Sequence, residues 1–216
     1  YPRERGDVAG AFLHPLAVAL RARGVDVRVV TPSDAGKGGR GTLDGVPVHR
    51  VRYAAADREQ YAQSGKLATA TKSPQGLKAL AGMIRALRAG AREELDGATR
   101  GVVHAHWWFP SGLAAPSEHP MVVTCHGTDV RMLETSGPAR WLAKRPFHRA
   151  RRVTTVSRSL ADALRTHGAK VADDSVVPMP VTAMERPWSI GGGGIVVLGR
   201  LTEQKRVHLA VEAYAL

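Results

Sequence analysis

The sequence predicts an α/β fold, in which a doubly wound parallel sheet is covered by helices on both faces. Short valine-rich apolar runs, typical of buried strands, alternate along the chain with segments that carry apolar residues at helical spacing. Glycine or proline stands at most changes from one kind of segment to the other. A run of four glycines at 191–194 then precedes a new apolar run, which predicts the start of a second α/β domain.

The first predicted helix begins at Gly10, carries Phe12, Leu16 and Leu20 on one face, and ends at Gly24. Because no strand pattern precedes this helix, we expect that a first strand of the sheet lies outside the sequence.

Two strands and two irregular segments follow. Residues 25–32 form an apolar run closed by a proline and are predicted to be a strand. The glycine-rich segment 36–41 is predicted to be a flexible turn, and 45–53 alternates as a second strand should. Residues 54–73 lack periodicity, so we expect a mobile loop there.

The middle of the chain predicts a long helix over 73–97, with a serine as its N-cap and a proline in its first turn. Residues 101–107 and 121–126 are the next predicted strands. A short helix is expected after Pro110.

The alternation continues with a basic helix over 138–150, a strand over 151–157, a helix over 158–168 and a short strand over 174–181. These elements complete a predicted domain over residues 1–182.

The remaining residues are predicted to be a linker, 183–194, and the truncated beginning of a second domain, 195–216. That beginning consists of a strand at 195–201 and a helix that runs to the end of the sequence.

Charge and composition narrow the classes of function. The net charge of +12 favours anionic partners such as phosphorylated ligands, lipid surfaces or nucleic acid, although an arginine-rich proteome would give the same surface. The single cysteine, Cys125, rules out an internal disulfide and fits a reducing, cytoplasmic compartment. No segment approaches the ~20 apolar residues of a membrane span, and the first residues lack a signal-peptide pattern.

Polar side chains follow two of the predicted strands. His126, Gly127 and Asp129 come directly after the apolar run of 121–126. Because ligands of open parallel sheets bind beyond the carboxyl ends of the strands, this segment is predicted to line the ligand crevice. Asp129 is placed either to bind a polyol or to orient the imidazole of His126.

The neighbouring strand end supplies further candidates. His104, His106, Trp107 and Ser111 follow or end the strand 101–107. An aromatic ring beside hydroxyl-binding groups suits the face of a sugar, although tryptophans that follow a strand also pack into cores.

Several segments, in this order, resemble family 4 glycosyltransferases: HAHWWFPSG, TCHGTD, TTVSRSLADAL, VVPMPV and VVLGRLTEQKR. The resemblance covers nearly the whole chain. It implies the two-domain GT-B fold, built of Rossmann-like domains. It also implies an enzyme that transfers a sugar, of hexosyltransferase type, from a nucleotide-diphosphate donor to a hydroxyl acceptor with retention of configuration. The nucleotide sugar is then a co-substrate, and no cofactor or metal is expected.

The resemblance also assigns roles to residues. His126 and Asp129 match the catalytic segment that approaches the reacting sugar. Gly10, Arg200 and Lys205 match groups that bind the donor diphosphate. The neighbouring strand end, which carries His104, His106, Trp107 and Ser111, is the expected acceptor-binding side, for a glycan, a lipid-linked or a small-molecule acceptor.

Two departures from the family pattern stand out. The family usually has a glycine-containing turn where this chain has PMPV. The paired glutamates that bind the donor sugar would lie beyond Leu216, so we expect the chain by itself to be inactive.

Other functions remain open at this point. A nucleic-acid- or anion-binding module would account for the charge, but no basic–aromatic recognition motif appears, and no nucleic-acid partner is expected. The His104/His106/His126 cluster could instead serve a metal-dependent hydrolase. A sugar-nucleotide epimerase could share the two-domain fold. The basic segment 140–152 could rest on an anionic membrane, at the inner face of the plasma membrane, or be the exposed face of an ordinary helix.

Overall fold

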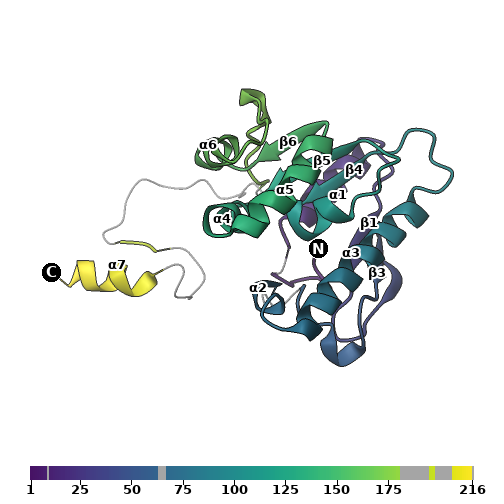
Figure 1. The fold of residues 1–216 in the computed structure, drawn as a ribbon, viewed down its shortest axis with the longest axis horizontal. Coiled ribbons are helices and arrows are strands. Elements are labelled where there is room, and N and C mark those ends of the chain that lie inside the picture. Colours follow the sequence, from purple (N-terminus) through teal and green to yellow (C-terminus); the bar gives the residue numbers. More distant parts are fainter. Residues whose placement is uncertain (9, 63–66, 181–194, 198–205, 216) are drawn as a thin grey trace. The chain divides into compact units, whose positions relative to one another are not determined.

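A computed structural model of the chain describes residues 1–8, 10–62, 67–180, 195–197 and 206–215. The chain divides into two compact units, Tyr1–Val181 and Thr182–Leu216. The first unit is a Rossmann-like α/β unit, as the sequence predicts, with helices packed on parallel strands (Figure 1). The assignment of the second unit to a donor domain stays a prediction.

The elements are as follows. The strands among the described residues are β1 (Val29–Pro32), β2 (Gly39–Leu43), β3 (Val46–Val51), β4 (Val103–His106), β5 (Met121–Cys125) and β6 (Arg152–Thr155). The α-helices there are α1 (Leu13–Ala22), α2 (Leu67–Ala70), α3 (Pro74–Glu94), α4 (Thr128–Thr135), α5 (Gly137–Arg149), α6 (Arg158–Thr166) and α7 (Val207–Tyr214). Short turns of other helix types are η1 (Ala56–Arg58), η2 (Trp108–Gly112) and η3 (Asp173–Ser175).

The strands form two sheets, in the orders β1-β3-β2 and β4-β5-β6, where the sequence predicted one. The pairs β1–β3, β4–β5 and β5–β6 are parallel, and β2–β3 is antiparallel. Helix α3 packs on β1 and β3, α5 on β5, and α6 on β6. Parallel pairing brings the carboxyl ends of β4 and β5 together, which is what positions the candidate site.

The strand β2 corrects the predicted flexible turn at 36–41. A two-residue turn joins β2 to β3, with Leu43 paired to Val46. Its residues, Asp44 and Gly45, have φ values of 48° and 76°, as the tight turns of β-hairpins require. The dipeptide Asp-Gly is itself a strong hairpin signal in a sequence, so the hairpin was predictable.

The expected mobile loop at 54–73 is also wrong for its described residues, which include η1 and α2. Glu59 is 1% exposed, and its carboxylate organises the segment. It accepts hydrogen bonds from the backbone N–H groups of Tyr53 (2.8 Å) and Gly36 (2.9 Å) and from the Arg52 guanidinium (2.9 Å). A buried carboxylate satisfied in this way fixes the surrounding backbone.

Most helix predictions are confirmed, with changes at the ends. The Ser73 side chain caps α3 by accepting from the Gly76 N–H, and Pro74 is its first residue. Helix α1 begins at Leu13, three residues later than predicted. Helix α4 was not predicted, because the polar residues of its first turn were interpreted as strand-end groups alone.

Two predicted strands are not seen in the part of the chain that the structure describes. Residues 174–180 contribute one bridge, between Val176 and Thr155, instead of a strand. Residues 195–197 are not in a strand, and 198–201 lie outside the described residues. Helix α7 matches the predicted terminal helix.

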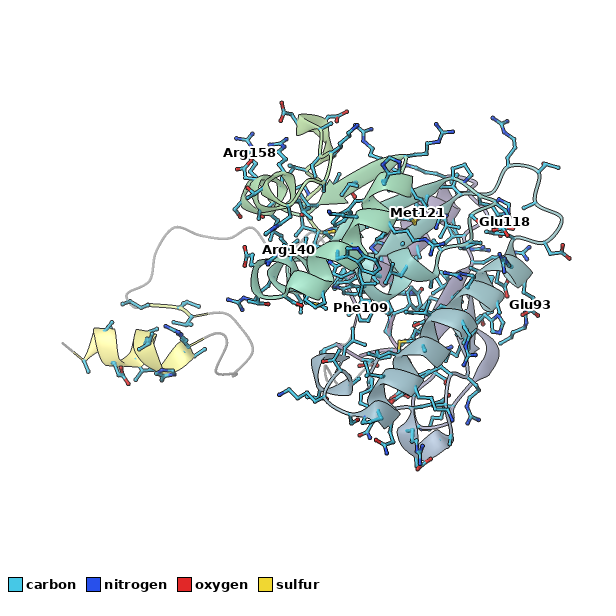
Figure 2. The ribbon with its side chains drawn as sticks, viewed as in Figure 1. Glu93, Phe109, Glu118, Met121, Arg140 and Arg158 are labelled. Carbon is cyan, nitrogen blue, oxygen red and sulfur yellow. The ribbon has the colours of Figure 1, made fainter. Side chains whose placement is uncertain are left out.

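Charged side chains cover the surface of the first unit, where Figure 2 shows Glu93, Glu118 and Arg158 directed outward. No helix in the described residues has the length and apolar character that crossing a membrane requires.

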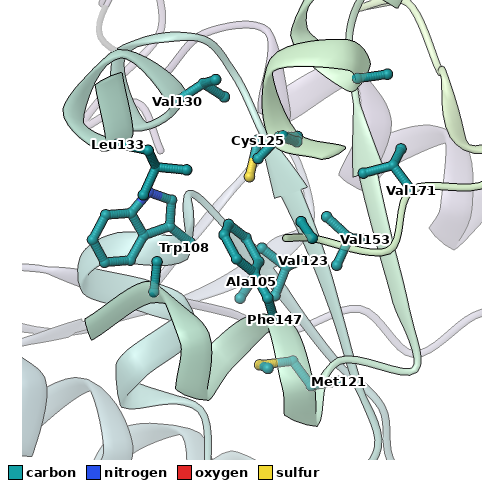
Figure 3. Close-up of a cluster of buried hydrophobic side chains, with 14 of the residues drawn as sticks. Ala105, Trp108, Met121, Val123, Cys125, Val130, Leu133, Phe147, Val153 and Val171 are labelled. Atoms are coloured by element: carbon teal, nitrogen blue, oxygen red, sulfur yellow. The ribbon is translucent and has the colours of Figure 1, made fainter. Parts of the chain in front are cut away.

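The main core lies between β4, β5, β6 and helices α4, α5 and α6 (Figure 3). Trp108 is fully buried there, and its ring lies 6.4 Å from that of Phe147. Cys125 is also fully buried. Burial, followed by the charge of Asp129, raises the pKa of the Cys125 thiol, so this cysteine is a packing residue, as predicted.

Candidate functional site

The carboxyl ends of β4 and β5 bring two predicted site residues into contact. His106, the last residue of β4, pairs with Thr124 of β5, and His126 lies two residues further along the chain. The Nδ1 atom of His106 and the Nε2 atom of His126 are 3.0 Å apart, which is a hydrogen bond. Each ring therefore fixes the orientation of the other.

Both imidazoles of this pair are neutral near pH 7. Burial, and next the neighbouring His104, lowers the pKa of His126 to about 4. Burial again, followed by His104 and His126, lowers the pKa of His106 to about 2. One neutral ring of the pair donates its proton to the other, and neither carries a charge.

His104 belongs to a second chain of hydrogen bonds. Its Nε2 atom is 2.7 Å from the Thr124 hydroxyl, which is 2.6 Å from the Thr154 hydroxyl. Thr154 donates its proton to the carbonyl oxygen of Val123. Because a hydroxyl has one proton to give, Thr124 donates to Thr154 and His104 donates to Thr124. This order fixes the tautomer of His104, whose ring centroid lies 4.3 Å from that of His106, with the two rings tilted by 31°.

Aromatic rings enclose His126. The ring of Trp107 lies 4.8 Å from the imidazole, and that of Phe12 lies 5.1 Å from it. The Nδ1 atom of His126 is buried, without a hydrogen-bond partner among the described residues. An unsatisfied buried nitrogen is costly, so this atom is the free polar group of the site.

Trp107 reaches this position through an unusual backbone. Its φ of 68° lies in the left-handed region, which bulky residues rarely adopt. The Trp107 N–H donates to the Thr124 carbonyl at 2.8 Å, and its own carbonyl accepts from Gly112. The next residue, Trp108, enters the core. Trp108 thus takes the core-packing role, and the sugar-binding role of Trp107 stays a prediction.

Asp129 braces the two strand ends. It is 2% exposed, and its Oδ1 accepts from the backbone N–H groups of His126 (3.0 Å) and Gly127 (3.1 Å). Its Oδ2 accepts from the N–H of Trp108 at 3.3 Å, while the Trp108 indole donates to the Asp129 carbonyl. The carboxylate thus holds the backbone around His126 and does not contact the imidazole, contrary to the predicted orienting role.

No hydrogen bond or ring contact joins the other predicted site residues to His126 among the residues that the structure describes. Gly10 lies in the turn before α1, with a φ of 70°, and Phe12 joins that turn to the site. Ser111 lies in η2, and its backbone carbonyl accepts from the N–H of Ala115. Arg200 and Lys205 lie outside the described residues.

Sequence reasoning missed three residues of the site: Phe12, Thr124 and Thr154. The threonines left a signal, because each is a polar residue within an apolar strand run. Phe12 left none, because its contact with His126 joins α1 to the end of β5.

The structure does not favour the alternative of a histidine metal site. Among the described residues, no group of three or more His, Cys, Asp or Glu side chains could hold a metal ion. The facing nitrogens of His106 and His126 already bond to each other.

Comparison with known protein families identifies the family of the chain. A family model described as "Glycosyl transferase 4-like domain" matches residues 9–182, which include the whole candidate site among the described residues. No curated protein matches the chain.

Proposed function

Because the chain belongs to the glycosyl transferase 4-like domain family, we propose that it transfers a sugar from a nucleotide-diphosphate donor to a hydroxyl acceptor, with retention of configuration. Family membership supports glycosyl transfer in general. The donor, the stereochemistry and the acceptor are our proposals.

The observation that carries the proposal is the state of His126. Its ring is neutral, fixed by His106, enclosed by two aromatic rings, and left with one free nitrogen. A neutral imidazole nitrogen can hydrogen-bond a sugar hydroxyl without attracting a counter-ion. Trp107 and Phe12 offer the apolar surface on which a sugar ring packs. A sugar that reaches Nδ1 has to displace part of this cover, so we expect Phe12 to move on binding.

The second part of the proposal concerns the leaving group. When the sugar–phosphate bond breaks, negative charge develops on the diphosphate, and fixed cations stabilise it as it forms. Arg200 and Lys205 are proposed for this role, with the turn at Gly10 supplying backbone N–H groups. The acceptor hydroxyl attacks from the side that the diphosphate leaves, and the leaving phosphate oxygen takes the hydroxyl proton.

The acceptor is proposed to approach from the β4 side. His106 and His104 are occupied with His126 and Thr124, so they position the site rather than bind the acceptor directly. Trp107 and Ser111 are left as the groups that touch it. A glycan, a lipid-linked or a small-molecule acceptor would fit this description equally.

The test, on the whole protein with its predicted second domain, is a donor titration followed by nitrogen-detected NMR of the histidine rings. We expect one class of nucleotide sugar to shift the Nδ1 resonance of His126 and to leave that of His119 unchanged. The His126→Ala variant loses the binding, whereas His119→Ala, in the loop before β5 and thus at the opposite end of that strand, retains it. In turnover assays, release of nucleoside diphosphate accompanies a product whose anomeric proton coupling matches that of the donor. A protein that binds no nucleotide sugar, or inverts the anomeric centre, would refute the proposal.

A further inference from the structure

The exposed face of α5 has a composition unlike that of the other helices. Trp141 is 71% exposed and the adjacent Leu142 is 38% exposed. A tryptophan is normally among the better buried residues of a protein. Lys144, Arg145 and His148 follow Trp141 at three, four and seven positions, so they lie on the same face of the helix.

The charge of this face is uncompensated. No Asp or Glu occurs in the sequence between Glu134 and Asp162. Within the described residues, no carboxylate forms an ion pair with Lys144 or Arg145. The positive charges act on each other as well: burial foremost, and then Arg145, lowers the pKa of Arg149.

Only part of the basic segment 140–152, which the sequence predicted as a possible membrane contact, is available on the surface. Phe147 points into the core. Arg149 donates to the carbonyls of Ala115 and Pro116, and Arg152 is paired with Asp174. The available surface is therefore the exposed face of α5 from Trp141 to His148; Figure 2 labels Arg140, the residue just before it.

The position of this face matters for function. Helix α4 begins at the His126–Asp129 segment, and α5 contacts both α4 and η2. Arg140 ties the start of α5 to the end of α4 through the Leu133 carbonyl at 2.8 Å. The exposed face thus belongs to an element packed on both segments that line the site.

From the exposed Trp141 and Leu142 beside unpaired Lys144 and Arg145, we propose that this face of α5 docks on a bilayer that contains anionic phospholipid. Tryptophan prefers the boundary between headgroups and acyl chains. Lysine and arginine next to it bind the anionic headgroups, and the two contributions together give a stronger contact than either alone. The contact is independent of the transferase chemistry, so it can fail while the proposed function holds.

The test is flotation of the protein with vesicles of phosphatidylcholine, with and without phosphatidylglycerol. We expect binding only to the anionic vesicles, and release by salt because salt screens surface charge. Lys144→Gln/Arg145→Gln should weaken binding by about 25-fold, since each cation near the surface contributes about fivefold. Trp141→Ser should weaken it too. In the wild type, binding should shift the tryptophan emission to shorter wavelength, and brominated lipid should quench that emission. Trp141→Phe should remove the component of the emission that shows both effects.

Helix α3 offers a matched control. Its Leu77 is 53% exposed, and Lys78 and Arg85 lie on its exposed side. Lys78→Gln/Arg85→Gln removes the same charge, and Leu77→Ser removes a comparable apolar group. We expect both to float as the wild type does. Because all the substituted side chains are exposed, every variant should keep its unfolding midpoint.

Any of four results would overturn the proposal. The first is equal binding to neutral and anionic vesicles. The second is an equal loss of binding for the α5 and α3 variants. The third is a wild-type dimer that Trp141→Ser converts to a monomer, without flotation, which would assign the face to a second copy of the chain. The fourth is binding to duplex DNA that the α5 variant loses, again without flotation.

Discussion

Replacement of Asp129 by alanine tests whether this carboxylate holds the candidate site together. The change removes the acceptor of three backbone N–H groups, those of His126, Gly127 and Trp108. Water cannot easily replace it, because the residue is 2% exposed. Each buried N–H left without an acceptor costs roughly 1–3 kcal/mol. Because the bond from Trp108 is long, we expect a total loss of about 3–5 kcal/mol in the free energy of unfolding.

Asp129→Asn distinguishes the contribution of the Oδ1 atom from that of the Oδ2 atom. An asparagine can keep its carbonyl oxygen toward His126 and Gly127, but it then turns an NH₂ group toward the N–H of Trp108. We expect a loss of about 1–2 kcal/mol, since one weak hydrogen bond is replaced by two facing donors. The order alanine, then asparagine, then wild type in increasing stability follows from the geometry alone.

Urea unfolding gives the free energies, and hydrogen exchange at the Gly127 and Trp108 amides reports the local effect. Asp162→Ala is the control, because that side chain is 72% exposed and pairs only with Arg165 among the described residues. Its loss should stay below about 1 kcal/mol. If Asp129→Ala unfolds within 1 kcal/mol of wild type, or leaves exchange at Gly127 unchanged, the bracing role is wrong.

Three further predictions concern the same site. Gly127→Ala should cost on the order of 2 kcal/mol in urea unfolding, because the φ of 111° is strained for any side chain, although an added Cβ would meet only Leu160, at ordinary contact distance. An unchanged midpoint would contradict this. The free energy of unfolding should fall as pH drops below about 6.5, because His126 takes up a proton there in the unfolded chain but only near its pKa of about 4 in the folded protein. By pH 4 the loss that is due to His126 is on the order of 3 kcal/mol. If the reasoning holds, His126→Asn should show a flatter dependence of stability on pH than the wild type. Thr124→Val keeps the shape but removes the hydroxyl between His104 and Thr154, so the free energy of unfolding should fall by about 1–2 kcal/mol. Nitrogen NMR should show a changed ratio of the two His104 tautomers, and an unchanged ratio would count against the assigned proton order.

The order of elements was predictable because it depends on local patterns. Valine-rich runs gave β1, β3, β4, β5 and β6, and helical spacing gave α3 and α6, with caps at the predicted serine and glycine positions. The β2–β3 hairpin was equally local, and the Asp-Gly pair was overlooked. The separation into two sheets could not be read from the sequence, since pairing between distant strands leaves no signature in either strand.

The candidate site was predictable as a place but not as a set of contacts. The rule for strand ends selects His106 and His126, and strand alternation predicts that His104 and His106 share a side. It could not show that Asp129 turns toward the backbone, because the same residue type serves as a helix N-terminal acceptor and as a ligand group. Only the start of α4 at Thr128 decides between these roles. The contact between Phe12 and His126 could be predicted only from the three-dimensional path of the turn before α1.

The neutrality of the two facing imidazoles follows from how the fold presents them. Parallel pairing at the β4 and β5 ends leaves the two rings within hydrogen-bond distance, and a shared proton between two neutral rings is favourable there. Protonation of either ring would place a charge in a partly apolar enclosure formed by Trp107 and Phe12, which burial disfavours. Because both pKa values lie well below 7, neither ring is an imidazolium near neutral pH, so the pair does not act as a general acid there. A site that needs no charged acid on this side suits the proposed reaction, in which the leaving group itself accepts the proton. In the whole protein, replacing His126 by glutamine, which keeps a neutral polar group, should therefore preserve more activity than replacing it by aspartate.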